Sequence, residues 1–202
     1  MTAALSGLGR PDIYGYTTAD LHALHDNRRR WELIDGSLIV SPATTIDHNT
    51  VARWIANILW DSNPSNEFVI GTDQSATIDD HNEPRPDVIV APADYLQQSP
   101  FPIEGAQLVV EVVSPTSVLR DTETKRALYA RAGVPAYGII VPDADKPTIS
   151  LAELVLDEQA GQYAFATHYT TEVFETRTPW PIRVDLPQLI ARRARMMRID
   201  PQ

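Results

Sequence analysis

Two segments of the chain carry the spacing of apolar residues that is typical of a helix packed by one face. In the first, which begins near Asp47 and ends near Asn63-Pro64, apolar residues recur at the i, i+3, i+4, i+7 and i+8 positions. These residues are Val51, Trp54, Ile55, Ile58 and Leu59. In the second, from about residue 119 to 132, Gly133 and Pro135 follow the stripe as a helix cap and a stop usually do. The pattern therefore predicts two helices that each pack one face against a sheet.

Shorter apolar runs bounded by turn residues predict strands. Residues 31–34 and 37–40 flank an Asp35-Gly36 turn and predict a hairpin. Residues 87–91 and 108–113 are apolar at almost every position, which is typical of strands covered on both faces. Further strands are predicted at 68–70, 75–78, 136–141, 149–156, 163–167 and 182–184, with short helices after Thr17 or Thr18 and over 186–198. The chain thus mixes helices and strands, as an α/β protein does.

Length and composition favour one folded domain over residues 1–202. With 202 residues and 43% hydrophobic content the chain can bury its own core; residues 1–13 are expected to form a flexible N-terminal extension and residues 186–202 a C-terminal helix and tail. The absence of cysteine excludes disulfides and thiolate metal ligands. The net charge of −10 argues against a broad basic surface, so any contact with a polyanion must be local. Neither a signal peptide nor an apolar run of membrane-spanning length is evident, which favours a cytoplasmic protein.

Three charged residues occur where the pattern predicts apolar surroundings. Asp87 opens one apolar strand, Glu111 interrupts a run of valines, and Lys125 lies on the helix stripe that must face the sheet. An ionised carboxylate in such surroundings loses its hydration, so it must find a cation, a metal ion or a proton. A metal site is therefore the sharpest hypothesis.

Each of these residues also has a purely structural interpretation. Glu111 could form a buried pair with an arginine such as Arg85 or Arg120. Asp87 could be a turn or cap residue. Lys125 could extend its stem to solvent or pair with Asp121 four residues earlier.

Taken together, two acids and a lysine at neighbouring strand and helix ends match the requirements of metal-dependent phosphodiester hydrolysis. The acids supply hard oxygen ligands for Mg²⁺ or Mn²⁺, and the lysine supplies a cation that orients and acidifies the attacking water. Motifs for nucleotide cradles, serine hydrolases and zincins do not occur in the sequence. The histidines are scattered, although His48 could approach the site from the start of its helix.

Two further charged segments are most simply solvated. The run from Asp79 to Glu83 has the composition of an exposed loop. The basic tail is expected to solvate the end of the last helix; its residues are Arg192, Arg193, Arg195 and Arg198.

Several segments between about residue 14 and residue 190 resemble, in the same order, segments of the Uma-two family, whose members are described as putative restriction endonucleases. The residues that carry the resemblance are Arg30-Trp31-Glu32-Leu33-Ile34-Asp35-Gly36, Ser41-Pro42 followed by His48, Arg85-Pro86-Asp87-Val88, Val110-Glu111-Val112-Val113-Ser114-Pro115-Thr116-Ser117, Lys125 and Tyr129-Ala130-Arg131-Ala132-Gly133-Val134-Pro135. The resemblance implies the PD-(D/E)XK nuclease fold, which is a restriction-endonuclease-like mixed sheet flanked by helices, here with additional antiparallel strands. It also implies divalent-metal catalysis and frequent dimerisation.

The resemblance assigns a role to each candidate site residue. Asp87 corresponds to the Pro-Asp position and Glu111 to the next acid, and both would bind Mg²⁺ with the backbone carbonyl of Val112. The lysine expected two residues after Glu111 is replaced by Val113, and Lys125 resembles its migrated equivalent. Glu32 matches an additional acid near the metal. A separate departure is Gly138, which stands where the family usually has a bulky aromatic residue.

These observations predict a metal-dependent endonuclease that hydrolyses phosphodiester bonds of nucleic acid, with Mg²⁺ or Mn²⁺ as cofactor. DNA is the expected substrate and a homodimer the expected assembly. One alternative is a binding or regulatory protein that keeps the fold but cleaves nothing, which the acidic composition favours. Another is a structural partner in an oligomer, with the acids in buried ion pairs.

Overall fold

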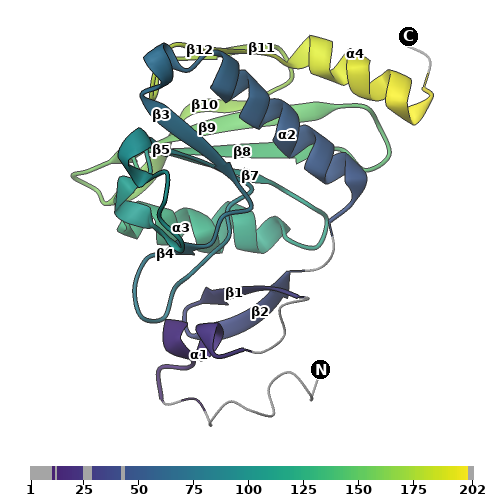
Figure 1. The fold of residues 1–202 in the computed structure, drawn as a ribbon. Coiled ribbons are helices and arrows are strands. Elements are labelled where there is room, and N and C mark those ends of the chain that lie inside the picture. The colour runs from purple at the N-terminus through teal and green to yellow at the C-terminus, as the bar shows by residue number, and fades with distance from the viewer. Residues whose placement is uncertain (1–10, 12, 25–28, 42–43, 200–202) are drawn as a thin grey trace.

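The computed structural model describes residues 11, 13–24, 29–41 and 44–199. At its centre is a six-stranded sheet formed by β3 (Phe68–Thr72), β5 (Val88–Pro92), β7 (Leu108–Val112), β8 (Ala136–Pro142), β9 (Ile149–Asp157) and β10 (Gln162–Thr170). The strand order is β10-β9-β8-β7-β5-β3 (Figure 1). The sheet is mixed, because β7 and β8 are parallel while the other neighbours are antiparallel. Of the extension predicted over residues 1–13, only Pro11 and Ile13 lie within the described residues.

Two helices cover the two faces of this sheet. Figure 1 shows α2 (Ile46–Asp61) across one face and α3 (Lys125–Arg131) across the other. Because side chains alternate along a strand, Val88 and Val110 pack with α2 while Ile89 and Val109 pack with α3. The near-continuous apolar runs of β5 and β7 follow from this double coverage, which confirms the mixed sheet flanked by helices.

The first predicted helix stripe is confirmed in α2. Thr45 caps the helix by accepting a hydrogen bond from the backbone N–H of His48 at 3.1 Å. The residues of the stripe that are buried against the sheet are Val51, Trp54, Ile55 and Leu59. The cap fixes where the helix starts, and so fixes the height at which His48 lies relative to the strand ends.

A small hairpin lies beside the main sheet, at the bottom of Figure 1. It consists of β1 (Arg30–Ile34) and β2 (Ser37–Ser41) and is preceded by α1 (Thr18–His22). Leu33 exchanges two backbone hydrogen bonds with Glu83, which ties the hairpin to the segment before β5. The expectation that the run from Asp79 to Glu83 is solvated is wrong for Asn82 and Glu83, which are both buried. Glu83 accepts a hydrogen bond from Ser75 at 2.6 Å.

The second predicted helix departs from regular α geometry in its first turn. Residues Arg120–Thr124 form a π-helical turn, η4, before α3 continues to Arg131. The backbone carbonyl of Asp121 accepts a hydrogen bond from the Tyr137 hydroxyl at 2.6 Å. This contact with β8 satisfies the carbonyl from outside the helix, so a wider turn is accommodated here.

The remaining elements are short, except for the 12-residue helix α4. They are η1 (Pro64–Asn66), β4 (Ala76–Thr77), η2 (Ala93–Tyr95), β6 (Phe101–Pro102), η3 (Ile103–Gly105), β11 (Val173–Thr176), β12 (Ile182–Asp185) and α4 (Leu186–Met197). β6 and β11 lie outside the strands that the sequence pattern predicts. No helix among the described residues is long and apolar enough to cross a membrane.

The basic tail is only partly solvated, because Arg193 of α4 is buried. Its guanidinium donates to both carboxylate oxygens of Asp47 at 2.9 and 2.7 Å. It also donates to the backbone carbonyls of Asp143, Lys146 and Thr148. Arg193 therefore fastens α4 to the first turn of α2 and to the loop after β8.

Gly138 of β8 faces α2 between Val110 and Glu153 on the neighbouring strands. The space beside it is a cavity of about 40 Å³, which is also lined by Phe174 of β11. An aromatic ring from another strand thus approaches the region where the resemblance implies a bulky residue at 138. A side chain at 138 would be crowded, because an added Cβ would lie 3.2 Å from Val110 Cγ2.

Arg193→Met should lower the free energy of unfolding by about 2–4 kcal/mol, because it leaves Asp47 without its partner and three carbonyls without a donor. Chemical denaturation measures this change. Arg195→Met is the matched control, since Arg195 is exposed on the same helix. Equal stability of the two variants would contradict the role of Arg193.

Glu153 generates a prediction about pH. Burial raises the pKa of this carboxyl, although a hydrogen bond from Thr176 works in the opposite direction. The folded state therefore binds the proton more tightly than the unfolded state, so stability falls as pH rises from the ordinary glutamate range through the raised pKa. Glu153→Gln should be more stable than wild type at pH 8, by on the order of 1 kcal/mol, with the gain shrinking toward acid pH.

Thermal melts across this pH range test the Glu153 prediction. The exposed Glu158→Gln provides the control for loss of one negative charge. A gain that does not change with pH would contradict the assignment.

Candidate active site

The Lys125 ammonium lies at the centre of a buried ionic cluster. Lys125 Nζ is 2.7 Å from Glu32 Oε1 and 2.9 Å from Glu111 Oε1. All three side chains are at most 3% exposed. The helix α3, the central sheet and the hairpin thus meet at the charge of Lys125. The pair of Lys125 with Asp121, which is one of the structural interpretations, is a weaker contact than the pairs with Glu32 and Glu111, because Asp121 Oδ1 lies 3.9 Å from Lys125 Nζ.

The strand register explains why Glu111 meets Lys125. Glu111 follows the alternation of β7, so it faces α3 while its neighbours Val110 and Val112 face α2. Lys125 begins α3, and Tyr129 lies one turn later on the same face. The Tyr129 hydroxyl donates to the same Glu111 oxygen at 3.0 Å. Two donors from one helix face therefore hold this carboxylate.

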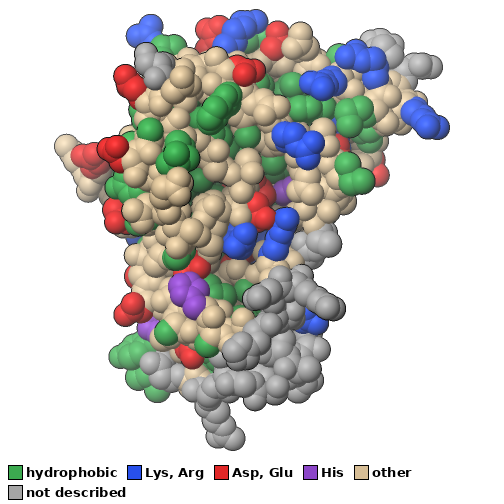
Figure 2. Space-filling model, viewed as in Figure 1, with side chains coloured by type: hydrophobic (Ala, Val, Ile, Leu, Met, Phe, Trp, Pro, Cys, Tyr) green, Lys and Arg blue, Asp and Glu red, His purple; other side chains and the backbone are tan. Residues whose placement is uncertain are grey.

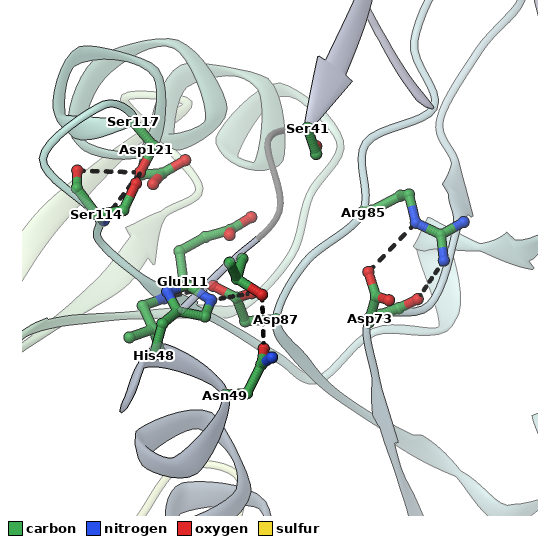
Figure 3. A network of polar contacts seen from close by, with 12 residues as sticks. Ser41, His48, Asn49, Asp73, Arg85, Asp87, Glu111, Ser114, Ser117 and Asp121 are labelled. Carbon is green, nitrogen blue, oxygen red and sulfur yellow. Dashed lines mark hydrogen bonds and ion pairs between the residues drawn. The ribbon is translucent and has the colours of Figure 1, made fainter. Parts of the chain in front are cut away.

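Glu32 reaches the cluster from the hairpin. Both of its oxygens are bound: Oε1 also accepts from the Arg85 backbone N–H at 2.9 Å, and Oε2 accepts from the Ser41 hydroxyl at 2.9 Å. Since Arg85 lies two residues before Asp87, this bond links the hairpin to the start of β5. The Arg85 side chain turns away to Asp73, as Figure 3 shows.

Asp87 lies at the edge of the cluster and is fixed by two other donors. Its Oδ2 accepts from the Val112 backbone N–H at 2.7 Å, and its Oδ1 lies 2.9 Å from His48 Nε2. The register pairs Val88 with Val110, which places Asp87 and Glu111 on adjacent strands at the same end of the sheet. Figure 3 shows the Asp87 carboxylate beside His48, with Glu111 next to it.

His48 lies near the site at the start of α2, in agreement with the expectation that it could approach from there. It is 8% exposed, and its Nδ1 is buried with no hydrogen-bond partner among the described residues. Because an ionised carboxylate only accepts, Nε2 is the nitrogen that donates to Asp87. His48 thus restricts the orientation of Asp87.

Two residues of the π-helical turn join the site without having been singled out as site residues. Asp121 is 3% exposed, and its Oδ1 has no hydrogen-bond partner in the described part of the chain. Arg120 Nε lies 3.7 Å from that oxygen and 3.9 Å from Glu32 Oε2. The i, i+4 spacing of Asp121 and Lys125 was the available signal for Asp121. No pattern distinguished Arg120 from a solvated arginine.

The charges at the site shift one another's pKa values. Burial opposes the charge of Lys125, but Glu111, Glu32 and Asp121 outweigh it and raise the pKa of the ammonium. Burial likewise opposes ionisation of Glu32, yet Lys125, the Arg85 amide and Arg120 lower its pKa. Burial raises the pKa of Glu111, which Lys125 only partly offsets. Three carboxylates, those of Glu111, Glu32 and Asp121, lie 2.7–3.9 Å from the Lys125 ammonium, and Asp87 lies beside Glu111. The site, with Lys125 and Arg120 as its cations, is therefore deficient in positive charge.

The donor set fits a hard divalent cation. Asp87 and Glu111 supply carboxylate oxygens from adjacent strands, and Val112, which follows Glu111, supplies a backbone carbonyl. The described residues contain no group of three His, Cys, Asp or Glu side chains suited to a metal ion. Mg²⁺ does not require one, because it usually keeps several waters and takes one or two carboxylates together with substrate phosphate. The oxygen-only chemistry and the charge deficit both suit such an ion.

The site reaches the surface at Asp87 and Arg120, whose side chains are 21% and 22% exposed. Figure 2 shows acidic, basic and histidine side chains together between α2 and the hairpin. A ligand could therefore approach the carboxylates from this side without unfolding the hairpin.

The fold and this site define a restriction-endonuclease-like α/β protein. The family model of Uma2 (Uma-two), described as "Putative restriction endonuclease", matches residues 18–178, and the chain belongs to this family. One similar solved structure is described as a putative nuclease belonging to DUF820 from Anabaena variabilis. It has a TM-score of 0.68 and 13% sequence identity, and the match covers 87% of this chain and 97% of that one. No curated protein sequence matches the chain.

Lys125→Met should lower the free energy of unfolding by about 3–5 kcal/mol in the presence of chelator, because Glu32 and Glu111 would lose their buried counter-ion. In the double variant Lys125→Met/Glu111→Gln, one stranded charge is already removed, so the loss should be smaller than the sum of the two single losses. Urea denaturation of the four proteins measures the coupling. Additive losses would contradict a shared buried ion pair.

Proposed function

We propose that this protein is a divalent-metal-dependent endonuclease that hydrolyses phosphodiester bonds of nucleic acid, with DNA as the substrate. The observation that carries the proposal is the placement of Asp87 and Glu111 on adjacent strand ends, beside a buried lysine. Membership of the Uma2 family supports the same activity. The homodimer, the single-domain boundaries and the cytoplasmic location stay predictions from the sequence.

In this proposal Asp87, Glu111 and the Val112 carbonyl would hold Mg²⁺ or Mn²⁺. The cation, when bound, lowers the pKa of water and neutralises charge that develops on the phosphate. Residues of the chain itself do the rest. His48 and the Val112 N–H hold the Asp87 carboxylate in one orientation, and Tyr129 and Lys125 do the same for Glu111.

Lys125 acts mainly through its charge, which positions water or stabilises developing negative charge. Its Nζ is held by Glu32 and Glu111, so the charge is fixed before substrate arrives. Glu32 in turn assists by fixing Lys125 and by offering a carboxylate near the metal position. A preorganised cluster of this kind loses nothing to reorganisation during the reaction.

One observation favours the alternative, a protein that binds nucleic acid but does not cleave it. The Lys125 side chain is only 3% exposed and both of its short contacts are to carboxylates. A lysine so enclosed cannot touch a phosphate directly. Turnover separates the two functions.

Cleavage of a mixed panel of DNA and RNA with Mg²⁺ or Mn²⁺ tests the proposal. Wild type should cleave at least one substrate, and Asp87→Ala should lose about 100-fold or more in kcat/KM because it removes a metal ligand. Asp94→Ala is the control, since Asp94 is exposed and lies after the same strand. Cleavage by Asp87→Ala at the wild-type rate would contradict the assigned site.

Thermal melts provide a second readout that needs no substrate. Metal should stabilise the wild type by mass action, on the order of 1–3 kcal/mol well above the dissociation constant. Asp87→Asn should be more stable than wild type in chelator, because a like charge is removed, and should lose most of the metal response. A destabilised variant, with no metal response in either protein, would mean that the acids form a structural salt bridge.

A further inference from the structure

The proposed reaction needs a cation that can reach a substrate phosphate, and Lys125 does not meet this requirement. Its ammonium is enclosed by Glu32 and Glu111, as described above. The phosphate of a nucleic acid is bulky and hydrated, so it contacts only groups that reach the surface of the site. The cation that binds the phosphate must therefore be accessible from the surface and must not be held by short contacts to carboxylates.

We infer that Arg120 binds a backbone phosphate of the substrate next to the scissile bond. This inference rests on the proposed function and assigns it a substrate-binding residue. Arg120 comes from the π-helical turn that also carries Asp121, one turn before Lys125. Its side chain is 22% exposed, compared with 3% for Lys125.

The contacts of Arg120 show that it is attracted to the site but not bound there. Arg120 Nε lies 3.9 Å from Glu32 Oε2 and 3.7 Å from Asp121 Oδ1, which exceeds hydrogen-bonding distance. Nε is buried and has no hydrogen-bond partner among the described residues. A buried donor without a partner is costly, so its persistence here needs an explanation. Because the Arg120 side chain is 22% exposed, a turn of its guanidinium toward the open edge of the site would let a phosphate oxygen satisfy this donor.

The neighbouring arginines are committed elsewhere. Arg85 and Arg30 both pair with Asp73, at 3.3 and 3.0 Å. Figure 3 shows Arg85 turned toward Asp73 and away from Asp87. Arg120 is thus the arginine that lies against the carboxylate cluster without a short contact to it.

The chemistry of the guanidinium suits this role. Its planar fork can donate two parallel hydrogen bonds to a phosphate, which a lysine cannot do. Because no short hydrogen bond holds Nε, engaging a phosphate would break no such bond at that atom. The net charge of −10 makes a local cation more important, since the rest of the surface repels a polyanion.

Binding of a fluorescent DNA duplex in Ca²⁺ buffer over a range of KCl concentrations tests the inference. Arg120→Gln should weaken binding several-fold and reduce the slope of log K against log salt by about 1, because one phosphate contact is lost. Arg120→Lys should keep the slope but bind more weakly, because it retains the charge and loses the fork. Arg183→Gln, which changes an exposed side chain of β12, should leave affinity and slope unchanged.

The possible results separate this inference from the proposed function. If wild type cleaves and binds DNA, and both Arg120 variants match its affinity and salt slope, the role of Arg120 is overturned while the nuclease stands. If wild type neither binds nor cleaves any substrate, the proposed function itself fails. Melting temperatures of the variants show whether the substitutions affect folding. If Arg120 has only a structural role, Arg120→Lys and Arg120→Gln should change the melting temperature and leave the salt slope of DNA binding at the wild-type value.

Discussion

The Lys125 ammonium, shared between Glu32 and Glu111, is the interaction on which the arrangement of the site depends. Each carboxylate alone would be too costly to bury among valines and tyrosines. With one cation between them, the hairpin, the central sheet and α3 become a single unit. The same unit sets the position of Arg85, whose backbone N–H binds Glu32. Asp87 is then placed two residues later, at the start of β5.

This arrangement accounts for a site whose ionic cluster is enclosed and which is open at one edge. Glu32, Glu111 and Lys125 are enclosed and hold one another, whereas Asp87 and Arg120 are partly exposed. Burial raises the pKa of Glu111 most, and repulsion from Asp121, Asp87 and Glu32 raises it further. A divalent cation would relieve that repulsion, so in the proposed site metal binding and stability would be coupled through the same residues. The helix α4 supports the site indirectly, because Arg193 donates hydrogen bonds to Asp47, the residue next to His48.

Much of the fold and part of the site could be predicted from local patterns. The stripe of α2, the Asp35-Gly36 hairpin and the apolar runs of β5 and β7 were predicted because each depends on residues close in sequence. Glu111 and Lys125 were noticed because a charge in an apolar run stands out.

The remaining features depend on contacts between distant segments, which periodicity does not record. Arg193 pairs with Asp47 across most of the chain, and Glu83 is buried by α1 and the hairpin. Glu32 was identified as a site residue only through the family resemblance, because nothing in the local sequence distinguishes a single acid in a hairpin from an exposed one. The π-helical turn contacts a tyrosine on the next strand, and the spacing of residues within the helix does not record such a contact.

A crystal structure with Mn²⁺ tests whether Asp87 and Glu111 form a cation site beside the ionic cluster. We expect an anomalous scattering peak between the two carboxylates and the Val112 carbonyl, at roughly 2.0–2.3 Å from its oxygen ligands, with Lys125 still bound to Glu32. Crystals in excess Mn²⁺ that show no peak there, while Asp87 remains bound to His48 and Val112, would mean that the two acids do not bind a cation.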